Sequence, residues 1–270
     1  MAAKLRSALG LVRSVAIYYG QPRRNRAQAR FYRQLFAPGE LAFDIGAHVG
    51  NRARALRAAG ARVIAVEPQP LFAGFLRRTL PADIVLVEAA VGPREATTRM
   101  RVSRLHPTVS SLSPDFGAEA AGMPGFGHVA WDAQAEVAVT TLDALIARHG
   151  MPGFVKIDVE GYEHEVLQGL GTAVPCLSVE FLPGMVARTR RVLDRLAELG
   201  HYRFNAVRGE ESAFLWPDWR TAGEIEAWLA TLPAGSSSGD LYARLVTADD
   251  QGSSGRAASS SAMSLSMGGR

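Results

Sequence analysis

The chain has 270 residues, 47% of them hydrophobic, and a formal net charge of +4, with 30 Lys and Arg against 26 Asp and Glu. This length and apolar content can build the core of one large α/β domain or of two small ones. A net charge this small does not require a nucleic-acid partner, and we expect none. The single cysteine, Cys176, excludes an intramolecular disulfide and fits a reducing compartment, so we expect a cytoplasmic protein.

Residues 1–35 predict a basic helical leader. Residues 1–39 contain eight Lys and Arg and no acidic residue. Arg6 and Arg13 interrupt the apolar stretch, which is also shorter than the roughly 20 residues that a bilayer span requires, so we expect neither a signal peptide nor a transmembrane helix. A helix here either packs on the following domain, which we favour, or lies on an anionic membrane surface as a peripheral contact. One face of this helix would carry Leu5, Leu9, Val12, Ala16 and Tyr19.

Five short apolar runs follow the leader, and an acidic residue lies at the end of each. Continuous runs of Val, Ile and Leu with little alternation are typical of parallel strands that are buried on both faces. Ligands of open parallel sheets bind outside the carboxyl ends of the strands. Acidic residues at that edge therefore predict a ligand with positive charge or many hydroxyls rather than a phosphate. The five acids are Asp44, Glu67, Glu88, Asp158 and Glu180.

Helical segments alternate with these strands. The alternation predicts right-handed parallel crossovers, and hence an α/β domain over residues 36–247 with a mostly parallel sheet and helices on both faces. One helix should be capped at Thr140 or Thr141 and end at Gly150. The other expected helices are at residues 51–59, 71–80, 162–170 and 188–199.

Four segments depart from this alternation. Residues 93–139 are rich in Pro and Gly and show no clean periodicity, which predicts a long lid or substrate loop. Residues 201–207 and 212–217 predict two strands joined by a short turn, so that one strand of the sheet is antiparallel. Residues 239–246 form an ordered element that the pattern does not assign. The Ser- and Gly-rich tail, residues 248–270, is expected to be disordered.

The sequence DIGAHVGN links the first strand to the first helix and indicates a cofactor site. Gly46 and Gly50 allow close backbone approach to a ligand, but His48 replaces a glycine that a nicotinamide or flavin site would use. Asp44 would repel a pyrophosphate, whereas the ammonium and sulfonium groups of S-adenosyl-L-methionine favour an acid. Glu67, about 20 residues on, is placed to bind a ribose diol. A glycine-rich turn with solvated acids is the simpler alternative. The candidate cofactor residues are Asp44, Gly46, His48, Gly50, Asn51, Glu67, Pro68, Glu88, Ala89 and Ala90.

The sequence KIDVEGYE indicates the chemical centre. Lys156 is one of only two lysines, and its place in an apolar strand suggests an ammonium paired with nearby carboxylates. Asp158 or Glu160 could act as a base on a substrate hydroxyl or orient it, and Glu180 lies opposite the same crevice. Glu160 and His164 have the spacing of metal ligands on a helix, but no third ligand is evident, so we expect no metal. The candidate catalytic residues are Lys156, Asp158, Glu160 and Glu180.

The polar segment HPTVSSLS offers hydroxyls and an imidazole for an acceptor pocket. His106, Ser110 and Ser111 are its candidate substrate-binding residues, and Tyr162 is a further one. An ordinary polar loop is an equal alternative.

Taken in order, FDIGAHVGN, AVEPQP, EAAVG, HPTVSSLS, TTLDALI, KIDVEGYEHEVLQGL and SVEF resemble the FkbM-type S-adenosylmethionine-dependent methyltransferases. The resemblance covers about residues 30–246. It implies a Rossmann-like fold with a seven-stranded sheet and O-methylation of a hydroxyl on a sugar, glycoconjugate or polyketide-type acceptor. It does not identify the acceptor, because the acceptor segment varies most in such enzymes.

The sequence therefore predicts a methyltransferase crevice with two halves. Asp44, Glu67 and Glu88 are assigned to the cofactor half, and Asp158, Glu180 and Glu160 to the acceptor half. The alternative is a catalytically silent protein that binds cofactor or glycan on the same fold. The expected partners are a small-molecule or glycan acceptor, and nothing in the sequence indicates an oligomeric state.

Overall fold

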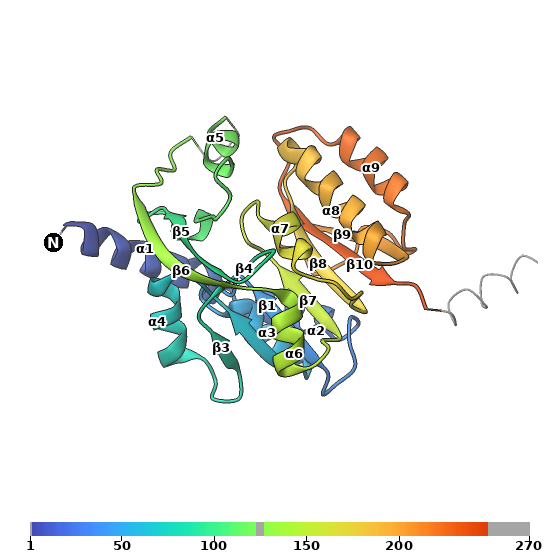
Figure 1. Ribbon diagram of the computed structural model, residues 1–270, viewed down its shortest axis with the longest axis horizontal. Coiled ribbons are helices and arrows are strands. Elements are labelled where there is room, and N and C mark those ends of the chain that lie inside the picture. Colours follow the sequence, from blue (N-terminus) through green and yellow to red (C-terminus); the bar gives the residue numbers. More distant parts are fainter. Residues whose placement is uncertain (1, 123–126, 248–270) are drawn as a thin grey trace, which may run out of the picture.

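The computed structural model describes residues 2–122 and 127–247 (Figure 1). The predicted disordered tail therefore lies outside the described residues. The central sheet has seven strands in the order β3-β2-β1-β7-β8-β10-β9, and β10 is antiparallel to both of its neighbours. This arrangement confirms the predicted seven-stranded, mostly parallel fold. The strands are β1 (Leu41–Ile45), β2 (Arg62–Val66), β3 (Val85–Val87), β7 (Phe154–Ile157), β8 (Cys176–Phe181), β9 (Tyr202–Arg208) and β10 (Gly239–Leu245).

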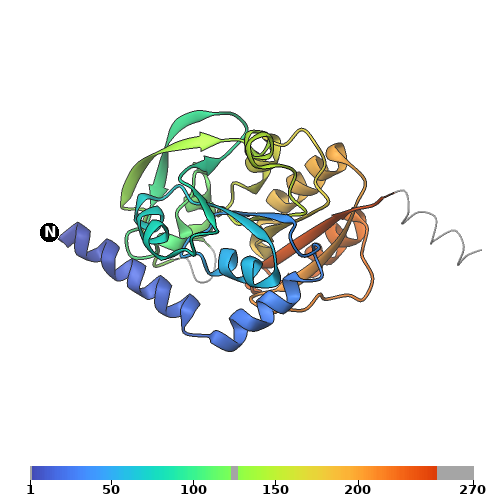
Figure 2. The ribbon, with the colours of Figure 1, turned by 90° about the horizontal axis from the view of Figure 1, so that it is seen from below.

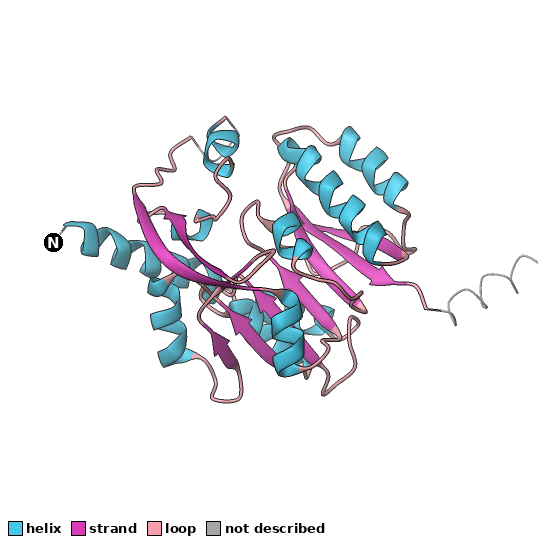
Figure 3. Ribbon diagram, viewed as in Figure 1, coloured by secondary structure: helices cyan, strands magenta, loops and turns pink. Residues whose placement is uncertain are grey.

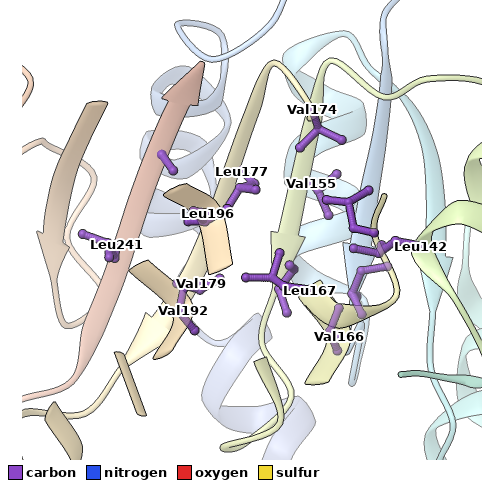
Figure 4. Close-up of a cluster of buried hydrophobic side chains, with 14 of the residues drawn as sticks. Leu142, Val155, Val166, Leu167, Val174, Leu177, Val179, Val192, Leu196 and Leu241 are labelled. Carbon is purple, nitrogen blue, oxygen red and sulfur yellow. The ribbon is translucent and has the colours of Figure 1, made fainter. Parts of the chain in front are cut away.

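Helices cover both faces of this sheet, as the alternating pattern predicts (Figure 3). On one face, α2 (Pro22–Tyr32), α3 (Asn51–Ala59) and α4 (Pro70–Thr79) pack over Ala42, Val63 and Phe154. On the other face, α6 (Leu142–His149), α7 (Glu163–Gln168), α8 (Val186–Leu199) and α9 (Ala222–Thr231) form the larger core (Figure 4). Because successive strand residues point to opposite faces, β1 supplies Ala42 to one core and Phe43 to the other.

Local signals account for several helix ends. Thr141 caps α6, its hydroxyl accepting a hydrogen bond of 3.0 Å from the backbone N–H of Ala144, as predicted. Thr221 and Glu224 form a capping box at the start of α9, a helix that the sequence pattern did not reveal.

The segment 93–139, for which the sequence predicts a lid or substrate loop, contains regular structure. It contains β5 (Ala96–Val102), the short 3-10 helix η1 (Pro107–Val109), α5 (Phe116–Ala121) and β6 (Ala133–Thr140). With β4 (Ala90–Val91), these strands form a second sheet in the order β4-β6-β5. The sequence did not indicate these two strands, because β5 and β6 are mostly exposed or half-buried and many Pro and Gly residues lie between them.

The late hairpin is also placed differently from the prediction. β9 forms as expected, but residues 212–217 are not a strand and make one backbone hydrogen bond to it, from Leu215 N to Ala206 O at 2.8 Å. The antiparallel strand is β10, the element that the sequence left unassigned. Its register runs from Gly239 opposite Arg208 to Leu245 opposite Tyr202.

The leader folds as two helices, α1 (Ala2–Tyr19) and α2. Helix α2 packs on α3 through Phe31 and Tyr32, and α1 contacts η1 and α4. The expectation that the leader packs on the domain is therefore met, but α1 turns a different face inward from the apolar one. Among the described residues, no helix is both long and apolar enough to cross a membrane.

The backbone packs closely around Gly46 at the end of β1. Its φ is +83°, and a Cβ there would lie 1.9 Å from the Asp158 carbonyl oxygen. We expect Gly46→Ala to lower the free energy of unfolding by about 2 kcal/mol or more, measured by urea denaturation. The matched control is Gly74→Ala in α4, where a Cβ meets nothing within 4 Å and should add about 0.5–1 kcal/mol. Equal effects of the two substitutions would contradict this packing.

Candidate functional site

A cavity with about 550 Å³ of empty space, open solvent included, lies beyond the carboxyl ends of β1, β2 and β7. This is the edge at which open α/β sheets bind their ligands. The second sheet and η1 cover it, contributing Met100, Pro107 and Leu112. The complete lining is Ile45, Gly46, His48, Val66, Glu67, Pro68, Gln69, Phe72, Ala89, Ala90, Val91, Met100, Pro107, Thr108, Ser110, Leu112, Asp158, Val159, Glu160 and Tyr162.

The glycine loop forms one wall of this cavity. Gly46 and His48 line it, while Gly50 and Asn51 cap and begin α3 without reaching the cavity. The backbone N–H groups of Gly46 and Ala47 both donate to Val66 O, which holds the loop over the end of β2. His48 adopts φ +52°, and burial lowers the pKa of its imidazole to about 4, so the ring is neutral.

Glu67 is buried at the end of β2 and its carboxylate faces the cavity. The backbone N–H of His48 donates to Oε2 at 2.7 Å, and that of Gln69 donates to Oε1 at 2.8 Å. Burial raises the pKa of Glu67 to about 8, although these two hydrogen bonds lower it. Each carboxylate oxygen can accept a second hydrogen bond, so a diol donor in the cavity would find both oxygens available.

Asp44 lies beneath the loop rather than in the cavity. It is fully buried, and neither carboxylate oxygen has a hydrogen-bond partner. Burial raises its pKa to about 6, while the Lys156 ammonium and, more weakly, the N–H of Ala53 lower it. Its side chain does not line the cavity, and the expectation that Asp44 binds the cofactor stays a prediction. From beneath the loop, the charge of Asp44 acts on the helix end and on Lys156.

Glu88 also departs from its predicted place. Its carboxylate pairs with Arg77 of α4, with Nη2 2.6 Å from Oε2, and does not line the cavity. The pair is exposed because β3 is an edge strand beside solvent. The neighbouring Ala89 and Ala90 do line the cavity, as does Pro68.

The second charged cluster is built on β7. Lys156 is 1% exposed, and its Nζ donates to Asp158 Oδ2 at 2.6 Å. Burial alone would raise the pKa of Asp158, but the Lys156 ammonium holds it below its usual value. Burial opposes the charge of Lys156 in turn, and Asp158, Asp240 and Asp44 raise its pKa. Lys156 and Asp158 are therefore both ionised.

Glu160 and Glu180 complete an acidic cluster with Asp158. One oxygen of each carboxylate lies within 4.8 Å of the others. Burial and the neighbouring carboxylates raise the pKa of both glutamates well above the usual value. Glu160 lines the main cavity, and Glu180 lines a smaller adjacent one. Three carboxylates at this spacing must share protons or hold a cation, so the expectation of no metal stays a prediction.

The loop that carries Glu160 is fixed from several directions. Glu160 has φ +55°, so the only two described residues other than Gly with positive φ, His48 and Glu160, both line the cavity. Ser111 Oγ donates to Glu160 O at 2.6 Å, and Arg188 donates to Gly161 O. Ser111 therefore positions the acidic loop and does not line the cavity, contrary to its predicted role.

The other acceptor candidates divide in the same way. Ser110 and Tyr162 line the cavity, but His106 lies at the surface, with Nδ1 2.7 Å from Nη1 of Arg13. Ten lining residues are not among the named candidates, and they include Gln69, Phe72, Met100 and Leu112. Gln69 and Phe72 follow Glu67 closely enough to have been considered. Met100 and Leu112 could not be placed without the second sheet.

The sequence matches a family model described as the methyltransferase FkbM domain over residues 44–233. The chain belongs to the FkbM methyltransferase family. It is a methyltransferase that uses S-adenosylmethionine as its cofactor. Against curated proteins, the sequence gives no significant match.

Solved methyltransferase structures resemble this FkbM-family chain at low identity. An O-methyltransferase from Bacillus cereus in complex with SAH is 12% identical, with a TM-score of 0.43, over 88% of this chain and 90% of its own. The magnesium protoporphyrin IX methyltransferase from Synechocystis PCC 6803 with bound SAM is 12% identical, with a TM-score of 0.42, over 87% and 84%. A precorrin-6y C5,15-methyltransferase from Geobacter metallireducens is 14% identical, with a TM-score of 0.40, over 81% and 86%.

The cavity of this FkbM-family enzyme fits S-adenosylmethionine. Gly46 of its glycine loop leaves room for close approach of a ligand to the backbone, and Glu67 offers two acceptor oxygens for a ribose diol. Phe72 and Met100 supply apolar surface for the adenine ring. No group in this lining is a phosphate-binding Lys or Arg, which agrees with a cofactor that carries no phosphate.

Glu67 should make cofactor binding depend on pH. In the free protein its pKa is about 8, so it is protonated below that pH, whereas a diol that donates to both oxygens needs the ionised form. Affinity for S-adenosylhomocysteine should therefore rise by up to about tenfold per pH unit from pH 6 to about 8, then level off. Calorimetric titration of the native protein and of Glu67→Gln across this range measures the effect. The variant should bind more weakly and lose the Glu67 contribution to the slope; identical slopes would contradict the assignment.

Proposed function

We propose that this methyltransferase acts on a hydroxyl group of a sugar, glycoconjugate or polyketide-type acceptor. The observation that carries the proposal is the acidic cluster of Asp158, Glu160 and Glu180 beside the cofactor cavity. A hydroxyl must lose its proton when its oxygen is methylated, and carboxylates both orient such a group and accept that proton. The resemblance of the sequence motifs to FkbM-type O-methyltransferases supports the same acceptor class.

The carboxylates have different roles in this proposal. Asp158, ionised beside Lys156, accepts a hydrogen bond from the acceptor hydroxyl and orients it. Glu160 takes the proton, because a carboxylate with a raised pKa is the stronger base once it is ionised. Glu180 shares the released proton with Glu160.

S-adenosylmethionine supplies an electrophilic methyl group, and the protein's main task is alignment. The loop around Glu160 is held by Ser111 and Arg188, so the acidic groups are fixed before the acceptor enters. Ser110 and Tyr162 line the remaining wall and are our proposed acceptor contacts. We also propose that the enzyme works in the cytoplasm on a small-molecule or glycan acceptor, and the buried thiol of Cys176 agrees with a reducing compartment.

Transfer of a labelled methyl group tests this function. The native protein and labelled S-adenosylmethionine are incubated with a fractionated extract of the source cells, and the labelled product is identified by mass spectrometry and NMR. We expect the label on an oxygen atom of a sugar or polyketide-type molecule. A label on nitrogen, carbon or RNA would contradict the proposal.

Asp158→Asn serves as the matched inactive variant in the same assay. It should lower the rate of label transfer by about 100-fold or more, the usual contribution of a positioned acid or base. Affinity for S-adenosylhomocysteine should change by less than about threefold, because Glu67 and the glycine loop remain. Asp83→Asn, which alters an exposed carboxylate paired with Arg57, should leave both quantities unchanged. If Asp158→Asn lost cofactor binding together with turnover, the assignment of Asp158 to the acceptor half would be wrong.

A further inference from the structure

Helix α1 lies on the site through its small residues. A Cβ at Gly10 would be 2.4 Å from Arg104 O and 2.9 Å from Pro107 Cδ, so the α1 backbone rests directly on the η1 segment. Ser14 is buried in the same contact. At the end of the helix, the ring of Tyr18 meets that of His48 edge-on, with centroids 5.2 Å apart. Both η1 and His48 belong to the cavity wall, so α1 is a strap over the cofactor site.

The opposite face of α1 is apolar and exposed. Leu5, Leu9 and Val12 are 62%, 54% and 65% exposed; Ile17, 45% exposed, lies about 120° around the helix from Leu5 and outside this face. These are four of the seven large hydrophobic side chains that are exposed in residues 2–122 and 127–247, so the exposure is concentrated on one helix. In Figure 2, α1 runs along the outer edge of the molecule, with no other described element on its far side. Single exposed apolar residues are ordinary, but a stripe along a helix marks a contact surface.

The charged side chains of α1 and α2 themselves are all positive; beside them, Arg6 lies 3.9 Å from Asp132 and Arg13 contacts His106. No acidic residue occurs in residues 1–39, and Arg6 and Arg13 lie beside the stripe on the helix. Helix α2 adds exposed guanidinium groups at Arg23, Arg26 and Arg30. A second copy of the chain docked here by a twofold axis would bring these positive groups together. A negatively charged surface instead complements them.

We propose that the exposed face of α1 docks on an anionic lipid surface. The helix would lie in the plane of the surface, with Leu5, Leu9 and Val12 below the headgroups and the arginines among the phosphates. Because the inner face of α1 packs on η1, docking brings the cavity within about one helix diameter, roughly 10 Å, of the lipid. This binding does not depend on the proposed O-methylation.

Vesicle flotation tests the docking. The native chain is mixed with vesicles of phosphatidylcholine alone, or of phosphatidylcholine with about 30% phosphatidylglycerol. The second kind has a negative surface like that of an anionic leaflet. We expect binding to the anionic vesicles, weakened at about 0.5 M salt because screening shortens the reach of the arginines. Leu9→Glu/Val12→Glu should reduce the partition coefficient by about tenfold or more.

Val85→Glu/Met151→Glu is the matched control, since both residues are exposed apolar side chains outside α1. It should bind vesicles like the native chain. Affinity for S-adenosylhomocysteine should be unchanged in both double variants, which shows that they are folded. Equal binding of Leu9→Glu/Val12→Glu and the native chain would overturn the proposal, as would equal binding to neutral vesicles. So would a dimer in vesicle-free solution that this variant dissociates. The O-methylation proposal survives each of these outcomes, because methyl transfer to a soluble acceptor is measured separately.

Discussion

The buried ammonium of Lys156 is the constraint on which the site depends. In the register of the sheet, Lys156 of β7 lies beside Asp44 of β1, and its Nζ reaches Asp158 at the strand end. A charge that is 1% exposed is tolerated only with ionised partners, and removing one partner of such a set costs about 3–5 kcal/mol. Lys156 therefore links the acid beneath the cofactor loop to the acid that faces the acceptor.

The Lys156 ammonium explains why neighbouring acids of the acceptor half differ in pKa. Asp158 stays ionised beside Lys156, whereas Glu160 and Glu180, further from it, have raised pKa values. The close approach of Gly46 to the Asp158 carbonyl brings the cofactor loop and the acceptor loop into contact. Cofactor and acceptor groups can then meet across a few ångströms of fixed structure, which suits a transfer governed by alignment.

The sequence was sufficient for the sheet and for much of the site because these depend on local patterns. Apolar runs ending in acids placed Glu67, Asp158 and Glu160 at the cavity, since a parallel strand fixes where its last residue lies. It was insufficient where position depends on distant partners. Glu88 forms an ion pair with Arg77, and Ser111 donates a hydrogen bond to the backbone of Glu160. Strands β5 and β6 are defined mainly by pairing with each other. Likewise, the sequence predicted the apolar stripe of α1, but it could not predict that Gly10 packs against Arg104 and Pro107.

The pH profile of methyl transfer in Lys156→Met tests the central role of this ammonium most directly. Without the cation, burial and the nearby carboxylates raise the pKa of Asp158 and raise further that of Glu160, the proposed proton acceptor, so the ionised forms that turnover needs are lost at a higher pH. The acidic limb of the profile should move upward by about 1 to 3 pH units, while affinity for S-adenosylhomocysteine at pH 8 stays within about threefold of the native value. An unchanged acidic limb in a variant that still binds the cofactor would contradict the account.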